Sequence, residues 1–523
     1  MILQNLVFPK ENICNEPELY FHGTTDGKIP AGNEADLFTY FNSFSAYKWK
    51  MYTTVEQVCF RLRCHGNCEI TLWDTKVEDG ADPAAHSFAS TKHEEGGADE
   101  VVLRFSLHDV KGIVYAVIKA ESDTVIFGGS FETVHEPVLP VKIAVGICTF
   151  RREEFVKKTL ETLKRETMEN PASPLYQNVY VYVSDNGQTL PCEELSNDRI
   201  FVMPNRNTGG SGGFGRCMKE AYEDREKYGL THILLMDDDI VLEPESFFRT
   251  YTLLNFLKEE RKGAMLGGGL LRLDIPYIQH ANGELWQGGR IGFTKRGYDL
   301  RRMTDVVRNE YNLPMDYNGW WYCCVPLAEQ FRGFPLPIFI HGDDIEYGLR
   351  FDGNIMTMNG IGVWHDAFDN RKASSMEYYD MRNTLIACAI HHPEYSRLHM
   401  IKRVARHLIG QMLHLRVKDQ ELTMKGVEDF CKGTEFLKEL DPTKLHPEIM
   451  KMGYAMQDVS DDLHKFGVDV EKTKPQPSHL YEDGGFAKKH LLSVNGWLLP
   501  AKKETAVLPM GVHPDALYRR KTA

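Results

Sequence analysis

The sequence predicts an α/β protein with a mostly parallel, Rossmann-like central sheet, preceded by an antiparallel β-sandwich and followed by a helical domain. Short strand-like runs fill the first part of the chain, and the prolines at 137 and 140 begin an alternation of apolar strands and helices. After residue 378 the pattern becomes mainly helical, with helices expected at 387–392, 397 to about 417 and 426–440. A chain of 523 residues is too long for one core. We therefore expect three domains, at residues 1–136, 137–377 and 378–523.

The first domain is predicted from short runs rich in β-branched and aromatic residues. These runs lie at residues 55–64, 69–73, 101–105 and 113–119, and Gly, Asn and Asp separate them. This pattern is typical of an antiparallel sandwich. The polar stretch from Glu78 to Glu100 contains few apolar residues, so we expect a mobile loop there.

The segment Cys64-His65-Gly66-Asn67-Cys68 connects the first two of these runs. Its spacing resembles half of a zinc site, but no second Cys/His pair follows at finger spacing. We therefore interpret the segment as a turn between two strands.

Polar residues follow the first two apolar strands of the central domain. One strand ends before Thr149, Arg151 and Arg152, and the next ends before Asp185. Because ligands bind beyond the carboxyl ends of parallel strands, these residues are candidates for contacts with a nucleotide. A carboxylate there can accept bonds from a base or ribose, and an arginine can bind phosphate. A turn residue or a solvated charge is the alternative for each.

The strongest local signal is the triplet Asp237, Asp238 and Asp239, which directly follows an apolar strand at 231–236. In extended backbone the first and third of these carboxylates project to one side. Two hard carboxylates suit Mg²⁺ or Mn²⁺ bridging a diphosphate. The alternative is that the acids cap the next helix or solvate a turn.

A glycine-rich segment at 207–216 precedes a helix that we predict from Phe214 to about Tyr228. Glycines let backbone N–H groups at a helix start approach an anion or a sugar closely. The segment is neither the dinucleotide fingerprint after a first strand nor a P-loop, and a flexible connection is the alternative. The candidates for donor contacts are Asn207, Gly209, Gly210 and Gly213.

A second acidic cluster begins a predicted helix at Asp343. Asp343 and Glu346 would share a helix face, while Asp344 points elsewhere. A carboxylate held near a hydroxyl group can act as a general base. The alternative is that acids in a first helical turn interact favourably with the helix dipole.

His365 and the pair Trp320 and Trp321 are the remaining candidates. A neutral imidazole can complete a Mn²⁺ site begun by carboxylates, although a lone histidine is more often structural. Adjacent tryptophans offer aromatic faces that stack on sugars, although core packing is their usual role.

Charge and cysteine usage narrow the partners and the compartment. With 74 acidic and 61 basic residues the formal net charge is -13, so nucleic acid is not an expected partner. Eleven scattered cysteines fit reduced thiols rather than a disulfide framework. The first residues do not resemble a secretory signal, and no apolar run approaches a membrane span. We expect a cytoplasmic protein that is soluble or peripherally attached to a membrane.

Taken together, several motifs resemble family 2 inverting glycosyltransferases of the galactofuranosyltransferase type. The similarity runs from about Phe38 to about His391. The motifs that carry it are Cys148-Thr-Phe, the Asn207-Thr-Gly-Gly-Ser-Gly-Gly-Phe segment, Leu234-Leu-Met-Asp-Asp-Asp-Ile, Asn318-Gly-Trp-Trp and Asp343-Asp-Ile-Glu-Tyr-Gly-Leu-Arg.

This resemblance implies a GT-A-type core that takes UDP-galactofuranose as donor and a lipid-linked cell-surface glycan as acceptor. It implies Mn²⁺ or Mg²⁺ bound by Asp237, Asp239 and His365, with Asp238 also on the donor side and Asp344 as the base. It further implies homo-oligomers at the inner face of the cell membrane. The residues expected to hold the acceptor are Trp320, Trp321, Asp343 and Glu346.

The sequence departs from that family at two positions. Gly342 stands where the family has tryptophan, and Asp380 stands where it has histidine, so the acceptor or donor-sugar site can differ.

Two other functions are alternatives. A rhamnosyltransferase using a dTDP-sugar would share the Asp and Gly-rich signals. A catalytically silent carbohydrate-binding protein would use the β-domain and the Trp pair instead.

Overall fold

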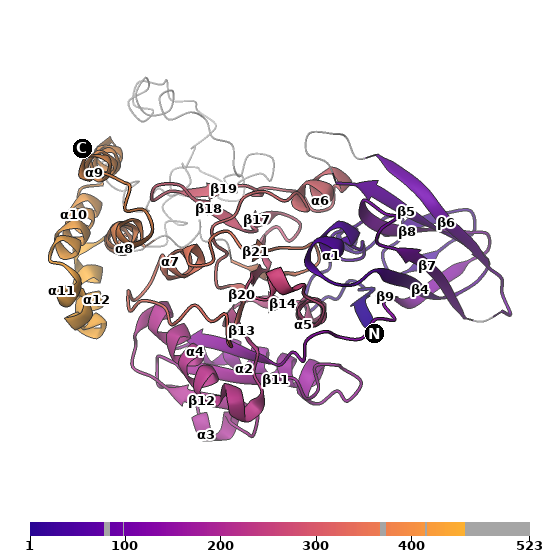
Figure 1. Ribbon diagram of the computed structural model, residues 1–523, viewed down its shortest axis with the longest axis horizontal. Coiled ribbons are helices and arrows are strands. Elements are labelled where there is room, and N and C mark those ends of the chain that lie inside the picture. Colours follow the sequence, from indigo (N-terminus) through magenta and orange to yellow (C-terminus); the bar gives the residue numbers. More distant parts are fainter. Residues whose placement is uncertain (78–83, 98, 367–372, 414–415, 455–523) are drawn as a thin grey trace, which may run out of the picture.

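The computed structural model describes residues 1–77, 84–97, 99–366, 373–413 and 416–454, and it has three parts. A β-sandwich lies at one end, a mixed α/β region lies in the middle, and a layer of helices lies at the other end (Figure 1). The fold class predicted from the sequence is confirmed. The domain boundaries at 136 and 377 stay a prediction.

The amino-terminal sandwich consists of two antiparallel sheets. In β4 and β5 alternate side chains are buried, so one face of each strand supplies the core between the sheets. The first sheet contains β1 (Ile2–Asn5), β9 (Thr124–Glu132), β4 (Gln57–His65) and β7 (Glu100–Ser106), with β2 (Lys28–Ile29) beside β9. The second contains β3 (Glu34–Asp36), β8 (Gly112–Ala120), β5 (Cys68–Lys76) and β6 (Ala85–His93).

Strand β6 corrects the expectation of a loop from Glu78 to Glu100. It pairs with β5 over its whole length, and Cys68 lies opposite His93. Most of its side chains are exposed, because β6 is the edge strand of its sheet. An exposed edge strand needs few apolar residues, which explains why its polar sequence resembles a loop.

The central sheet has the order β12-β11-β10-β13-β20-β15-β21. Its first four strands are parallel to one another, as predicted, while β20 is antiparallel to both of its neighbours. The strands are β12 (Ile200–Pro204), β11 (Val179–Asp185), β10 (Ile143–Thr149), β13 (His232–Asp237), β20 (Tyr322–Pro326), β15 (Met265–Gly267) and β21 (Ile355–Met356). The helices between them include α2 (Glu153–Leu163), α4 (Gly209–Tyr228) and α5 (Pro244–Asn255).

A smaller sheet continues from the end of β13. Its order is β14-β22-β16-β17, and β14 runs antiparallel to β22. The strands are β14 (Val241–Leu242), β22 (Gly362–His365), β16 (Gly269–Arg272) and β17 (Gln279–Ala281), followed by the hairpin β18 (Glu284–Trp286) and β19 (Ile291–Phe293). Because β14 starts just after the aspartate triplet, its pairing with β22 brings His365 back to that turn.

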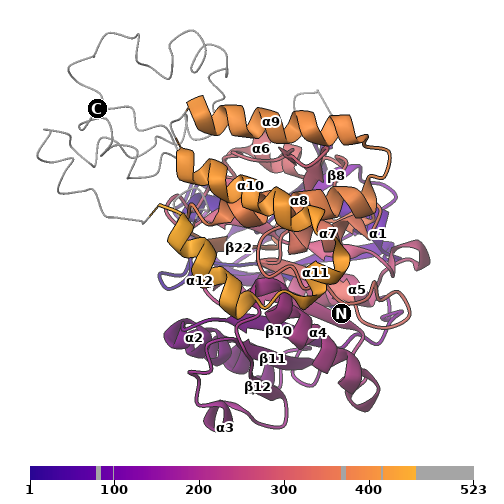
Figure 2. The ribbon, with the colours of Figure 1, turned by 90° about the vertical axis from the view of Figure 1, so that its left-hand side faces the viewer.

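The carboxy-terminal part is helical, as predicted, although its helices begin and end at other residues. We expected helices at 387–392, 397–417 and 426–440, but α8 begins eleven residues earlier, at Met376 rather than Ala387. Residues 367–372, 414–415 and 455–523, which include the final 45 residues whose structure the sequence left open, lie outside the described residues. The helices are α8 (Met376–His391), α9 (Arg397–Leu413), α10 (Val417–Cys431), α11 (Thr434–Glu439) and α12 (Pro442–Met452). Figure 2 shows them together on one side of the molecule.

Within the described residues, none of the helices has the length and apolar character needed to cross a membrane.

A buried ion pair joins the sandwich to the central region. Arg249, on α5, is completely buried, and its Nε lies 3.1 Å from a carboxylate oxygen of Glu245. The same oxygen of Glu245 accepts the backbone N–H of Asn5 at 2.6 Å, while Arg249 donates to the carbonyl of Asn5 at 3.1 Å. Removing one partner of such a pair typically costs about 3–5 kcal/mol. Strand β1 is therefore fixed to the helix that follows the candidate site.

Candidate active site

The aspartate triplet lies at the carboxyl end of β13, in the turn that leads to β14. Asp238 points into the protein, where its carboxylate accepts a hydrogen bond from Thr149 Oγ1 at 2.6 Å. Arg152 Nη1 lies 3.0 Å from the other oxygen of Asp238 and 2.7 Å from Asp239. Thr149 and Arg152, predicted as donor contacts, thus hold the turn in place from the end of the neighbouring strand β10.

Asp237, Asp239 and His365 come together as the sequence analysis proposed. Each offers one ligand atom, and these atoms lie within 4.8 Å of one another. His365 Nε2 lies 3.0 Å from Asp239 Oδ1. Carboxylate oxygens with an imidazole nitrogen form a donor set that suits Mn²⁺, and the carboxylates also suit Mg²⁺.

The hydrogen bonds of His365 support this fit. Its Nδ1 lies within hydrogen-bond distance of the Asp366 carbonyl, and a carbonyl only accepts, so Nδ1 carries a proton. In the neutral ring Nε2 would then place a lone pair against the Asp239 carboxylate. Either a second proton or a cation has to lie between them. Burial alone would lower the pKa of His365, but the hydrogen bond to Asp239 and the charge of Asp237 outweigh it and raise the pKa.

Burial also perturbs Asp237. It raises the pKa of Asp237 to about 7, and the charges of Asp239 and Asp238 act in the same direction while His365 and Arg152 oppose it. Three acids in one turn repel each other, and this repulsion destabilises the folded chain. A bound cation would offset the repulsion. The turn is therefore prepared for positive charge.

The glycine-rich segment is helical from Gly209, which corrects the expected start at Phe214. Its glycines permit close packing, because a Cβ on Gly213 would lie 2.1 Å from Cys148 Sγ, at the end of β10. Gly209 has φ +70°, and a Cβ there would lie 2.1 Å from the Phe339 carbonyl oxygen. A Cβ on Gly210 would lie 3.4 Å from Asp343 Oδ2. The start of α4 therefore lies beside the second acidic cluster.

Three predicted donor contacts have local partners. Asn207 accepts the backbone N–H of Gly209 at 3.1 Å, which makes it part of the α4 start. Asp185 is fully buried, and its carboxylate accepts backbone N–H groups of the turn that follows it, from Gly187, Thr189 and Leu190. Arg151 is exposed, with its guanidinium 5.2 Å from the centroid of the Phe150 ring. These contacts favour a structural role for Asp185, and the donor contacts stay predictions.

Asp343 and Asp344 begin α7 (Asp343–Leu349), directly after Gly342 at φ +80°. Both side chains are partly exposed, yet the protein around them removes much of their hydration. Burial raises the pKa of Asp343 to about 7 and that of Asp344 to about 6, and repulsion by Asp344 adds to the shift of Asp343. Asp344 Oδ1 also accepts the N–H of Ile345 at 2.8 Å. Such carboxylates can exchange protons near neutral pH.

Glu346 and the tryptophan pair are more buried than an acceptor platform requires. Glu346 is 2% exposed, forms an ion pair with Arg350 at 2.6 Å and lies 3.0 Å from His391 Nε2. Trp320 is 5% exposed, and Trp321 donates its indole N–H to a backbone carbonyl at 2.9 Å. These contacts favour ion pairing as the role of Glu346 and core packing as the role of the two tryptophans. Their proposed roles in acceptor binding stay predictions.

Glu284 and Tyr317 lie near the second acidic cluster, and the sequence analysis did not identify them. The Tyr317 hydroxyl donates to Glu284 at 2.6 Å. Burial raises the pKa of Glu284 to about 7, and the charge of Asp344 adds to the shift. Glu284 stands alone in its segment, without an acidic neighbour or motif, so only the tertiary structure brings it to this place.

The two departures from the resembled family lie next to each other. Asp380 lies on α8, and its Oδ1 is 2.7 Å from His341 Nδ1. His341 immediately precedes Gly342. A Cβ on Gly342 would meet only the side chain of Asn383, at 3.6 Å. The acid at position 380 favours the positively charged form of His341. A charged histidine can therefore occur at position 341, whereas the resembled family has its histidine at position 380.

Comparisons with known proteins agree with this arrangement. Residues 6–133 match the family described as Galactofuranosyltransferase 2 N-terminal, and residues 144–299 match Glycosyl transferase family 2. The first match covers most of the sandwich. The second runs from β10 past β19, so it includes the aspartate triplet and ends before α7.

Two curated relatives are both named galactofuranosyltransferase GlfT2. The one from Mycobacterium tuberculosis is 28% identical over 464 residues, which is 82% of this chain and 70% of the relative. The one from Mycolicibacterium smegmatis is 26% identical over 479 residues, which is 85% of this chain and 71% of the relative. Similarity therefore extends across all three parts of the chain.

We predict that Mn²⁺ binds more weakly as the pH falls from about 8 to about 6. Asp237, with its pKa of about 7, and His365, with its raised pKa, must both lose protons before they can bind a metal. Below those pKa values each displaced proton lowers the affinity roughly tenfold per pH unit. Calorimetry in buffers of different ionisation enthalpy measures both the affinity and the released protons.

Asp237→Asn should remove most of this binding, and the exposed Asp198→Asn should leave it unchanged. Equal Mn²⁺ affinity at both ends of the pH range, without proton release, would contradict the assignment of these ligands.

Proposed function

The chain is a family 2 glycosyltransferase of the galactofuranosyltransferase type, and we propose that it transfers galactofuranose from UDP-galactofuranose to a hydroxyl group of a glycan. The observation that carries this proposal is the group formed by Asp237, Asp239 and His365 at the end of β13. It lies where a parallel sheet binds a nucleotide, and its ligand types suit a diphosphate-bound cation.

On the donor side, Asp237, Asp239 and His365 would hold Mn²⁺ or Mg²⁺. When bound, this ion would supply Lewis acidity that stabilises charge on the departing UDP. Arg152, already bonded to the triplet, adds a positive charge at the same edge. The Gly209 N–H already donates to Asn207. We assign anion binding to the N–H of Gly210, because the start of a helix favours negative charge. The exposed Arg151 is proposed to meet the phosphates, while Asp185 shapes the donor side by holding the turn after β11 through its bonds to Gly187, Thr189 and Leu190.

On the acceptor side, Asp344 acts as the general base. It takes the proton of the acceptor hydroxyl while that oxygen forms a bond to the anomeric carbon and the bond from that carbon to UDP breaks. Attack from the face opposite UDP inverts the anomeric configuration. With a pKa of about 6, Asp344 is ionised at neutral pH and still basic enough to accept the proton. Burial and the charge of Asp344 also raise the pKa of the neighbouring Asp343.

The acceptor is proposed to lie along α7 and the segment that carries Trp320 and Trp321. The Trp320 ring packs edge-on against Tyr347, which follows Asp344 by one turn of α7. Glu346 supports the same helix through Arg350 and His391. These contacts support a role for the segment in shaping the acceptor side, with Asp343 nearest to the glycine-rich helix.

The acceptor is further proposed to be lipid-linked, with helix α9 lying on the membrane. Four apolar side chains on one face of α9 are between 51% and 63% exposed: Leu398, Ile401, Ile409 and Met412. The helix contains no acidic residue, and Arg397, Lys402 and Arg406 flank that face. A basic amphipathic helix with an exposed apolar face is typical of attachment to an anionic membrane surface. Figure 2 shows α9 at the outer edge of the helical layer.

We expect transfer from UDP-galactofuranose and little from dTDP-rhamnose when both are offered to one preparation with Mn²⁺ and a glycolipid acceptor. Mass spectrometry of the acceptor identifies the sugar added. Excess EDTA and Asp239→Ala should each abolish transfer, with the circular dichroism of the variant unchanged. Preference for dTDP-rhamnose, or full activity in EDTA, would contradict the donor or the metal assignment respectively.

Asp344→Asn should lower kcat by about 10²–10⁴-fold, because the amide keeps the size of the carboxylate but cannot accept a proton. The wild-type kcat should fall as the pH drops below about 6, where the carboxylate takes up a proton. Calorimetry should give unchanged affinity for UDP with Mn²⁺, and Asp198→Asn serves as control. If the variant keeps more than about a tenth of wild-type kcat, Asp344 is not the base.

Vesicle sedimentation tests the membrane contact. The wild-type protein should sediment with phosphatidylglycerol vesicles and less with phosphatidylcholine vesicles, because α9 is basic. Changing both Ile401 and Ile409 to Glu should abolish this binding, while Phe127→Glu, an exposed apolar position on the sandwich, should not. Binding that survives the double change would move the membrane contact away from α9.

A further inference from the structure

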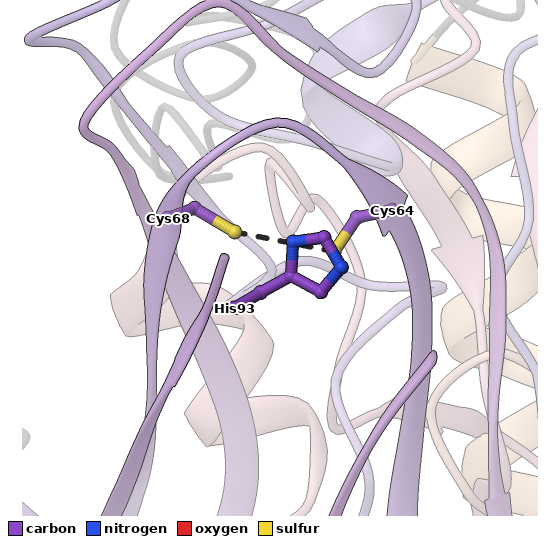
Figure 3. Close-up of side chains that lie close together, drawn as sticks. All are labelled: Cys64, Cys68 and His93. Carbon is purple, nitrogen blue, oxygen red and sulfur yellow. Dashed lines mark hydrogen bonds between the residues drawn. The ribbon is translucent and has the colours of Figure 1, made fainter. Parts of the chain in front are cut away.

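Three buried side chains in the sandwich, Cys64, Cys68 and His93, form a second cluster of metal-ligating groups (Figure 3). Cys64 and Cys68 are 0% and 1% exposed, and His93 is 5% exposed. Their ligand atoms lie within 4.8 Å of one another. The cluster belongs to the amino-terminal sandwich and shares no residue with the aspartate turn.

The cluster depends on tertiary structure rather than on motif spacing. Cys64 lies near the end of β4, Cys68 begins β5, and His93 ends β6, directly opposite Cys68 in the β5–β6 register. Sequence analysis set a zinc site aside because no second Cys/His pair follows at finger spacing. The third ligand instead comes from the strand β6, which the sequence did not predict.

The distance between the sulfur atoms distinguishes a metal site from a disulfide. Cys64 Sγ and Cys68 Sγ lie 3.9 Å apart. Two sulfurs bonded at about 2.3 Å to one tetrahedral Zn²⁺ would lie about 3.8 Å apart, whereas a disulfide bond is about 2.05 Å long. The two thiols are thus already at the separation that a shared zinc ion requires. Both are free cysteines.

His93 is oriented by a hydrogen bond that favours metal binding. Its Nδ1 lies 2.6 Å from the Gly66 carbonyl, and because a carbonyl only accepts, Nδ1 carries the proton. In the neutral ring Nε2 then carries the lone pair. Metal-binding histidines are commonly fixed in this way, with the other ring nitrogen donating to a backbone carbonyl. Figure 3 shows the imidazole ring of His93 together with the two cysteine side chains.

The turn that presents these groups is built tightly. Gly66 has φ +103°, and a Cβ there would lie 2.4 Å from the Asp123 carbonyl oxygen. Only glycine fits this position, so the carbonyl of Gly66 is held beside His93. Both cysteines are then fixed at the two ends of the same turn.

We propose that Cys64, Cys68 and His93 bind a Zn²⁺ ion that joins the two sheets of the sandwich. Two thiolates and one imidazole occupy three tetrahedral positions, and a solvent molecule takes the fourth. Thiolate ligands select zinc over Mn²⁺ or Mg²⁺, so this site differs chemically from the catalytic metal group. Cys64 belongs to one sheet, and Cys68 and His93 belong to the other. The ion thereby anchors the edge strand β6, whose outer side has no neighbouring strand among the described residues.

Metal analysis of the full chain, purified without chelators, tests this site. We expect about one zinc per chain in the wild-type protein and in Asp239→Ala, and much less in Cys64→Ser and Cys68→Ser. Cys59→Ser, on the same strand β4 but outside the cluster, is the matched control and should keep its zinc. Zinc lost from Asp239→Ala but retained in Cys64→Ser would overturn the proposal.

Thiol alkylation of the wild-type protein gives a readout that does not depend on folded variants. Iodoacetamide followed by peptide mass spectrometry should modify Cys64 and Cys68 only after zinc is removed by a chelator, and removal should lower Tm. Cobalt in place of zinc should produce thiolate-to-metal charge-transfer absorption. A Cys64–Cys68 disulfide in the purified protein, or the absence of that absorption, would overturn the proposal. Glycosyl transfer is measured separately, so failure of either proposal leaves the other testable.

Discussion

The site depends on the repulsion between carboxylates gathered at the end of β13. Asp237, Asp238 and Asp239 share one short turn, and burial raises the pKa of Asp237 to about 7. Two side chains from neighbouring elements offset this repulsion. Arg152 follows β10, His365 ends β22, and both contact Asp239. The parallel arrangement of β10 and β13 and the antiparallel pairing of β14 with β22 are what bring them there. A divalent cation is the remaining counter-charge that this geometry accommodates.

The second acidic cluster uses the same physical effect for a different purpose. At the start of α7, partial burial places the pKa of Asp344 near 6, where a carboxylate is ionised at neutral pH and can still accept a proton. The glycine-rich start of α4 packs against both the end of β10 and Asp343, because its glycines have no side chains to keep these elements apart. In the proposed mechanism the donor therefore lies at the end of β13 and the start of α4, and the acceptor lies beside the start of α7.

Local sequence predicted the elements whose apolar pattern is regular. The strands that end at Thr149, Asp185 and Asp237 are where their β-branched runs indicated. Asp237, Asp239 and His365 lie close together as strand-end positions and family resemblance predicted, while their binding of a metal stays a prediction. Prediction failed where tertiary contacts decide. Strand β6 has a polar sequence because it is an edge, and α4 begins at Gly209 because packing stabilises a glycine-rich first turn. Glu284 and His93 reach their clusters from distant segments, which no local spacing could reveal.

The measurement that tests the account most directly is anomalous diffraction from crystals grown with Mn²⁺ and UDP. The account predicts a manganese peak at coordination distance from Asp237, Asp239 and His365 Nε2, with diphosphate oxygens completing the shell and the start of α4 beside them. A manganese peak elsewhere, or UDP bound with no metal at the end of β13, would contradict it.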